Sequence, residues 1–271
     1  MAPKLLIIII LCCINRFILY SFDKILSKLC QNSRMNILKE FSINDKCSYL
    51  ANKEQNTHYK VIDDCDIAQC QDLIERGYRR FGKMFFRPVC GECNECQSIK
   101  VDVKNFKFSK SMRRVIKKAS HIQSYIQQPT LSKEHLELFE KYHLHMSETK
   151  GWDYQEASAD NYYNSFVNGH NEFGYEILYY DEDKLIGVDL IDILDDGISS
   201  IYFYYDPDYM KYSLGKFSLY NQIHLAQNSK KSWIYLGYYV EECPSLSYKS
   251  HYKPYLTLRG RPSTQEKYLW D

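Results

Sequence analysis

The stretch YEILYYDEDKLIGVDLIDILDDGISSIYFYYDP, residues 175–207, decides the fold. Apolar and aromatic runs alternate in it with two short acidic turns, which is the pattern of a β-meander. The pattern predicts three consecutive strands, over residues 175–180, 185–194 and 198–205.

A helix and a further strand follow the meander. Residues 214–227 carry apolar side chains at helical spacing, and residues 233–240 form an apolar and aromatic run. The order β-β-β-α-β predicts an α+β fold with a mixed sheet and helices, preceded by a small Cys-rich N-terminal region. This order resembles the acyltransferase fold of the GCN5-related N-acetyltransferases.

The segment between the third strand and the helix departs from that fold family. Those acetyltransferases hold the pyrophosphate of coenzyme A with a glycine-rich turn at this place. Here residues 206–215 offer one glycine and two aspartates, which make a poor anion site. We therefore expect acyl transfer from a donor other than acetyl-coenzyme A, and a coenzyme A-dependent N-acetyltransferase is the less favoured alternative.

Charge is nearly balanced over the 271 residues, with a net charge of +1. A nucleic-acid-binding face must therefore be a local patch. Residues 100–118 are the candidate, because this segment contains many Lys and Arg residues and a single acidic residue, Asp102. The alternative is an ordinary solvated surface. The expected phosphate contacts are Lys110, Arg113, Arg114, Lys117 and Lys118.

Ten cysteines are spread unevenly along the chain. Cys90, Cys93 and Cys96 are too close together to staple distant parts of a fold, and Cys47 lies upstream. Thiolates at C-x-x-C spacing hold a structural zinc ion or an iron–sulfur cluster, so we expect these four cysteines to bind a metal in a reducing compartment. The alternative is free thiols that pack as small apolar groups.

The first 34 residues contain an apolar run that Asn15 and Arg16 interrupt. A membrane-spanning helix needs about 20 mainly apolar residues, and no clear cleavage site for a signal peptide follows. We expect an apolar leader or a spurious extension over residues 1–34, with the working protein starting at Met35. A Cys-rich N-terminal domain over residues 35–128 and an acyltransferase-like C-terminal domain over residues 129–271 then follow.

Four motif groups lie in order between Met35 and Leu258: CSYL at 47–50; ERGYRRFG at 75–82 with FFRP at 85–88; FYYDP at 203–207 with SLG at 213–215; and YLGYY at 235–239 with CP at 243–244 and YK at 248–249. Together they resemble the arginyl/leucyl-tRNA–protein transferase family. The CSYL opening and the spaced cysteines after Arg-Pro are similar to its bacterial aspartate/glutamate leucyltransferase branch. Eukaryotic members instead carry a C-G-Y-C opening and an adjacent cysteine pair.

The resemblance implies a cytoplasmic aminoacyltransferase. Its partners would be an aminoacyl-tRNA and proteins that begin with Asp or Glu, which the transfer marks for N-degron proteolysis. The bacterial branch commonly uses leucyl-tRNA; arginyl-tRNA with the same acceptors is the alternative, as is a non-catalytic, metal-containing RNA-binding protein. Transfer needs no cofactor, and we expect no stable membrane association.

The donor ester is already activated, and the nucleophile is the acceptor's α-amine, whose pKa of about 7.7–8.0 leaves part of it neutral at pH 7. The protein must supply orientation, a proton acceptor and donors for the oxyanion. Tyr238 and Tyr239, at the end of a central strand, are the candidate catalytic residues, and Asp206 is the candidate to hold the acceptor's ammonium. Core packing and a turn opener are the respective alternatives.

Substrate binding is expected from two further groups. Arg79 and Arg80, on a loop after Gly77, would clasp the acceptor's carboxylate or a tRNA phosphate, unless they form surface ion pairs. Tyr248 and Lys249 would contact the 3′-terminal adenosine or the ester, unless they only anchor their loop. Residues 206–215 add two more candidates, Ser213 and Gly215, although Ser213 is also a natural helix cap.

Overall fold

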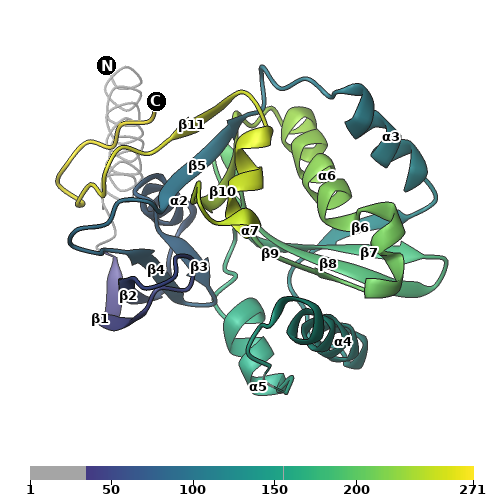
Figure 1. The fold of residues 1–271 in the computed structure, drawn as a ribbon, viewed down its shortest axis with the longest axis horizontal. Coiled ribbons are helices and arrows are strands. Elements are labelled where there is room, and N and C mark those ends of the chain that lie inside the picture. The colour runs from purple at the N-terminus through teal and green to yellow at the C-terminus, as the bar shows by residue number, and fades with distance from the viewer. Residues whose placement is uncertain (1–34, 155) are drawn as a thin grey trace, which may run out of the picture. The chain divides into compact units, whose positions relative to one another are not determined.

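A mixed seven-stranded sheet is the centre of this computed structural model, which describes residues 35–154 and 156–271 (Figure 1). The strands lie in the order β11-β5-β10-β9-β8-β7-β6, and only β9 and β10 pair in parallel. Their bounds are β5 (Gln97–Asp102), β6 (Gln123–Gln127), β7 (Gly174–Asp181), β8 (Lys184–Ile193), β9 (Gly197–Tyr205), β10 (Trp233–Tyr239) and β11 (Tyr255–Thr257).

The parallel pair separates soon after it begins. Its ladder covers three residue pairs and ends where Tyr235 lies opposite Ser199. Beyond that point β9 stays with β8 and β10 stays with β5, and β10 shifts register between Tyr235 and Gly237. The two strands thus form a fork, whose arms are residues 200–205 and 236–239.

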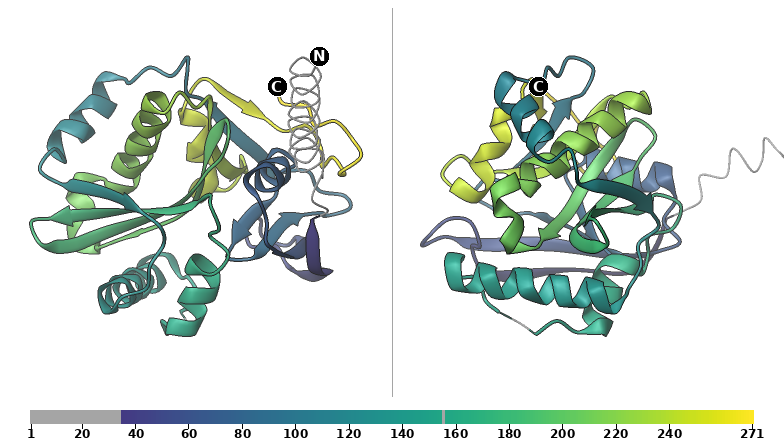
Figure 2. Two further views of the ribbon diagram at one scale, coloured as in Figure 1. Left: turned by 180° about the vertical axis from the view of Figure 1, so that it is seen from behind. Right: turned by 90° about the vertical axis from the view of Figure 1, so that its right-hand side faces the viewer.

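Helices cover both faces of this sheet (Figures 1 and 2). Side chains of β7 alternate between the faces, as a pleated strand requires: Ile177 and Tyr179 pack in one core and Leu178 in the other. One face carries α3 (Lys110–Lys118) and α6 (Leu214–Asn228). The other carries α4 (Lys133–Lys150), α5 (Ala159–Tyr162) and the π-helical turn η1 (Tyr163–Val167).

The predicted β-β-β-α-β order is confirmed. The meander became β7, β8 and β9, the helix became α6, and the further strand became β10. The α+β fold with a mixed sheet follows from apolar and aromatic runs that short acidic turns separate. Helix α3, which carries the basic segment, was not predicted as a helix.

A second sheet lies beside the first, in the order β1-β2-β4-β3. Its strands are β1 (Asn36–Lys46), β2 (Glu54–Asp63), β3 (Arg79–Phe81) and β4 (Met84–Pro88), with α2 (Ile67–Glu75) between β2 and β3. Arg79 and Arg80 therefore lie in a strand and not on a loop, which corrects the prediction. In a strand the two side chains point to opposite faces.

The expected domain boundary at residue 129 falls inside one compact unit. Residues 36–271 form that unit, and β5 and β6, which precede the boundary, are strands of the main sheet. The expected extension over residues 1–34 lies outside the described residues. The chain continues through η2 (Pro207–Tyr212), α7 (Pro244–Ser247) and η3 (Tyr248–His251). Within the described part of the chain, every helix is too short or too polar to cross a bilayer.

Candidate active site

Arg79 enters the fork between β9 and β10. Its Nη1 donates to the carbonyl oxygen of Leu236 at 3.1 Å, and Nη2 donates to those of Ser200 and Ile201 at 3.0 and 2.7 Å. Where the two strands separate, their carbonyl groups do not pair with each other, and Arg79 supplies the charged hydrogen-bond donor. Buried backbone carbonyls need such a partner. Arg79 is half-buried and closes the inner end of the fork.

Gly237 makes room for this guanidinium. Its φ is +74°, and a Cβ built on it would lie 1.4 Å from Nη1 of Arg79. Both the left-handed backbone and the contact therefore require glycine at this position. The Gly at the centre of the YLGYY motif is explained by an arginine far away in the sequence.

Arg80 points away from the fork and is 3% exposed. Its Nη2 and Nε donate to Oδ1 and Oδ2 of Asp192 at 2.6 and 3.0 Å, and its guanidinium lies over the ring of Phe173. The prediction that Arg80 clasps a substrate is therefore wrong, because a buried bidentate ion pair already holds it.

Tyr238 is also committed to the scaffold. It is 4% exposed, and its hydroxyl lies 3.0 Å from the carbonyl oxygen of Phe86 and 3.2 Å from that of Gly77. Burial raises the pKa of Tyr238 well above its ordinary value. A phenol held in this way links the two sheets, which fits the alternative of core packing and not the predicted catalytic role. Tyr239 is half-buried, and its catalytic role stays a prediction.

Asp206 cannot hold the acceptor's ammonium as predicted. Its Oδ1 lies 2.5 Å from Nζ of Lys141 and its Oδ2 lies 2.7 Å from Nζ of Lys184. Burial alone would raise the pKa of Asp206, but the hydrogen bonds from these lysines outweigh it and lower the pKa below its usual value. Two protein ammonium groups thus occupy the carboxylate, which also accepts from the backbone N–H of Asp208.

Tyr248 and Lys249 differ in their surroundings. Tyr248 is 45% exposed, whereas Lys249 is 8% exposed and its Nζ donates to the carbonyl oxygen of Tyr238 at 2.6 Å. Burial and the nearby charge of Arg79 lower the pKa of Lys249 well below its ordinary value. Lys249 therefore lies beside the fork, at the β10 arm.

A cleft of about 610 Å³ opens between the starts of α3 and α6, the end of β9 and η3. It brings together three predicted substrate residues, Ser213, Gly215 and Tyr248. The side chain of Ser213 makes no cap hydrogen bond, and the space around Gly215 is open. The cleft is lined by Ser111, Met112, Tyr205, Ser213, Leu214, Gly215, Lys216, Tyr220, Tyr248, His251 and Tyr252.

Sequence reasoning missed part of this lining. Met112, Tyr220, His251 and Tyr252 come from three separate elements, and nothing local in the sequence marks them as neighbours. Four tyrosine rings surround the cleft, and none of its lining residues is an Asp or Glu. Such a surface suits apolar groups and nucleobases, because rings stack on either.

The predicted tRNA contacts all lie on α3, with exposed side chains. The same helix supplies Ser111 and Met112 to the cleft, and two of its cations, Arg113 and Lys117, line a separate groove. That groove has a volume of about 670 Å³, and it is also lined by Phe108 and His224, whose ring centroids lie 4.3 Å apart in a stacked arrangement. Phosphate binding by α3 stays a prediction.

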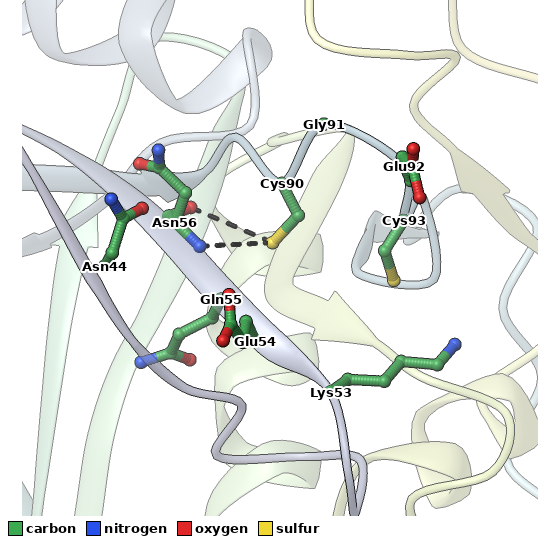
Figure 3. Close-up of a pocket in the computed structure, with 9 residues that line it drawn as sticks. All are labelled: Asn44, Lys53, Glu54, Gln55, Asn56, Cys90, Gly91, Glu92 and Cys93. Atoms are coloured by element: carbon green, nitrogen blue, oxygen red, sulfur yellow. Dashed lines mark hydrogen bonds between the residues drawn. The ribbon is translucent and has the colours of Figure 1, made fainter.

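The four predicted metal ligands are neighbours. Burial and then the nearby thiols of Cys47, Cys90 and Cys93 raise the pKa of Cys96 to about 12. Figure 3 shows the Cys90 sulfur pointing toward Asn56, whose backbone N–H donates to it at 3.4 Å. Among residues 35–154 and 156–271, no three His, Cys, Asp or Glu side chains are arranged to hold a metal ion.

Comparisons with known proteins agree with the motif pattern. The family model for the N terminus of arginine-tRNA-protein transferase matches residues 45–114, and the model for its C terminus matches residues 134–259. An aspartate/glutamate leucyltransferase of Campylobacter jejuni subsp. jejuni serotype O:6 is 48% identical over 231 residues, which cover 85% of this chain and 97% of that protein. The enzyme of that name from Helicobacter hepaticus is 37% identical over 237 residues, covering 88% and 98%.

Among solved structures, L-PGS from Bacillus licheniformis matches with a TM-score of 0.41 and 15% identity, covering 65% of this chain and 50% of that one. FemX matches with a TM-score of 0.41 and 9% identity, covering 62% and 59%.

Proposed function

The chain belongs to the arginine-tRNA-protein transferase family, and from this premise we propose that it transfers leucine from leucyl-tRNA to the N-terminus of proteins that begin with Asp or Glu. It is thus an aminoacyltransferase. Its partners are leucyl-tRNA and acidic N-termini, it acts in the cytoplasm, and its products enter N-degron proteolysis. The relatives named aspartate/glutamate leucyltransferase support both the donor and the acceptors.

The chemistry of the cleft carries the preference for leucyl-tRNA over arginyl-tRNA. A leucine side chain packs against Met112, Leu214 and the tyrosine rings without losing a hydrogen bond. An arginine side chain would instead bring a guanidinium beside Lys216 into a lining that contains no carboxylate. Placing an unpaired charge there is costly.

The remaining parts of the donor have places on the same face. The unpaired acceptor end of a tRNA stacks its terminal adenosine on aromatic side chains, and Tyr205, Tyr248 and Tyr252 offer such surfaces. The tRNA phosphates then meet Arg113, Arg114 and the other cations of α3. The donor therefore enters along α3 and places its ester at the start of α6.

Transfer itself requires no covalent enzyme intermediate. The acceptor's neutral α-amine attacks the ester carbonyl and a tetrahedral oxyanion forms. The oxyanion collapses to the amide as the ester C–O bond breaks, and the tRNA leaves through its ribose oxygen, which takes up the proton that the amine loses. Leu214 and Gly215, the first two residues of α6, line the cleft, and the first backbone N–H groups of a helix have no partner within it. We assign to them the stabilisation of the oxyanion.

A direct transfer assay tests the function. The protein is incubated with radiolabelled leucyl-tRNA or arginyl-tRNA and with peptides beginning with Asp, Glu, Ala or Lys. Leucine on the Asp and Glu peptides alone is expected. Met112→Glu, which adds a carboxylate to the cleft, should lower leucine transfer, and Met112→Leu is the matched control. Arginine transfer by the unaltered protein would overturn the proposed donor.

The cysteine group carries a separate proposal. We propose that Cys47, Cys90, Cys93 and Cys96 hold one structural zinc ion or an iron–sulfur cluster, because three of them pack in one cluster and Cys90 belongs to the same spaced run; the described side chains are not arranged around a metal, so the four thiols would have to turn toward one point to bind it. Arg261 ties the Cys loop to the C-terminal segment by donating to the carbonyl oxygens of Cys90 and Cys93 at 3.0 and 2.8 Å. Elemental analysis of the purified protein tests this, and loss of the metal in Cys93→Ser is the expected result.

A further inference from the structure

Lys249 is exceptional among the buried cations. Five Lys or Arg side chains are buried in the described part of the chain, and four of them form ion pairs with carboxylates at 2.6 to 3.2 Å: Lys60, Arg76, Arg80 and Lys100. Among the described residues, the hydrogen-bond partner of Lys249 is the carbonyl oxygen of Tyr238. The charged groups that act on it are Arg79 and the thiol of Cys243.

Arg79 is the second cation without an ion pair at this place. Its three hydrogen bonds go to backbone carbonyls. Asp192 is the carboxylate that feels its charge, but Asp192 is already held in a bidentate pair by Arg80. Arg79 and Lys249 therefore bind carbonyls only two residues apart on β10, those of Leu236 and Tyr238, and within residues 35–154 and 156–271 no carboxylate forms an ion pair with either side chain.

An arrangement of this kind is expensive unless an anion completes it. Three of the five N–H donors of Arg79 and one of the three on Lys249 are used, so both side chains retain donors for a ligand. The site adjoins the cleft, because Tyr248, which lines the cleft, feels the charge of Arg79 and directly precedes Lys249.

The anion must come from a group that lies close to the reacting ester. The phosphates of the donor are occupied along α3, but the acceptor carries a carboxylate on a short side chain next to its attacking amine. We propose that Arg79 and Lys249 together bind the side-chain carboxylate of the acceptor's N-terminal Asp or Glu, an inference that rests on the proposed transferase function. The two cations thereby position the amine at the cleft and reject Asn, Gln and apolar N-termini.

The state of Lys249 fits this role. Burial and the charge of Arg79 hold the pKa of Lys249 well below its ordinary value. A carboxylate that enters supplies the missing counter-charge and favours the ammonium form. Selectivity then comes from charge completion, since an amide of the same shape leaves both cations uncompensated.

The test compares acceptors in variants of Lys249. Lys249→Met keeps the length of the side chain and removes its charge, and Lys249→Arg keeps the charge. In Lys249→Met, kcat/KM for Asp and Glu peptides should fall by about 30-fold or more through KM, as for truncation of one partner of a buried charge pair. The KM for leucyl-tRNA should be unchanged, and the ratio of Asp to Asn peptide transfer should collapse. Lys249→Arg should retain most of that ratio.

Lys216→Met is the matched control, because it removes a cation from the cleft wall on the donor side. It should raise the KM for leucyl-tRNA and leave the Asp to Asn ratio intact. An unaltered ratio in a folded Lys249→Met protein would sink the inference while the proposed function stands. If the unaltered protein transfers leucine to no acidic peptide, the proposed function itself fails.

A measurement on the unaltered protein covers the case in which Lys249→Met does not fold. An amine-acylating reagent is applied in the presence of a peptide beginning with Asp or with Asn, and labelling at Lys249 is read by mass spectrometry. Protection by the Asp peptide alone supports the assignment. Equal labelling with both peptides overturns it.

Discussion

Replacing Gly237 by alanine tests whether Arg79 and the fork form one unit. The added Cβ would lie 1.4 Å from Nη1 of Arg79, and the backbone at this position has a φ of +74°. The left-handed conformation costs a non-glycine residue about 1–2 kcal/mol. Expulsion of Nη1 removes at least its hydrogen bond to the carbonyl of Leu236, which is worth about 1.5–3 kcal/mol for a charged donor. Gly237→Ala should therefore destabilise the protein by about 2.5–5 kcal/mol.

Gly260→Ala isolates the backbone contribution. Gly260 has a φ of +64°, but no atom lies within 4 Å of its added Cβ. This control should lose only about 1–2 kcal/mol. Both variants are measured by urea unfolding followed by circular dichroism, together with leucine transfer to an Asp peptide. If the two variants lose equal stability and Gly237→Ala keeps full transfer, the coupling between Gly237 and Arg79 is refuted.

Three further perturbations test other parts of the structure. The double variant Arg113→Glu/Arg114→Glu should weaken leucyl-tRNA binding far more than peptide binding. In a filter-binding assay, the slope of the logarithm of the binding constant against the logarithm of the salt concentration should become shallower by about one unit per lost phosphate contact. Lys133→Glu on α4 is the control. Burial raises the pKa of Asp189 to about 7, so the folded state keeps this proton at pH values where the unfolded chain loses it. The free energy of unfolding should therefore fall as the pH rises from about 4 to about 7, and in Asp189→Asn this part of the pH dependence of urea unfolding should vanish. Asp206→Asn should cost about 1–2 kcal/mol, because Lys141 and Lys184 lose a buried partner but stay half-exposed, and a loss above that range would show a larger role for this ion-pair group.

The main sheet was predictable because local sequence patterns mark most of its strands. Apolar runs separated by short acidic turns predicted β7, β8 and β9, and apolar side chains at helical spacing predicted α6. The basic segment was also found, although its helix was not. Helix α3 begins at Ser109, which caps it through the N–H of Met112, and this capping signal was available in the sequence.

The roles of individual site residues could not be predicted in the same way. Arg79 and Arg80 are adjacent and chemically identical, yet strand geometry sends one into the fork and the other to Asp192. The partners of both lie more than a hundred residues further along the chain, at Ser200 and Asp192. Asp206 likewise meets Lys141 from α4 only when the tertiary structure forms. No local pattern encodes such pairings.

The placement of Arg79 has a consequence for how the protein is made. Ser200 and Leu236 follow Arg79 by 121 and 157 positions, so a ribosome synthesises this arginine long before its carbonyl partners exist. Strand β5 is likewise synthesised long before β10, the strand with which it pairs on one side. The N-terminal half therefore cannot complete its native contacts during translation, and an arrested or truncated chain that ends before β10 exposes an unpaired arginine and an open sheet edge to the chaperones and proteases of the cell.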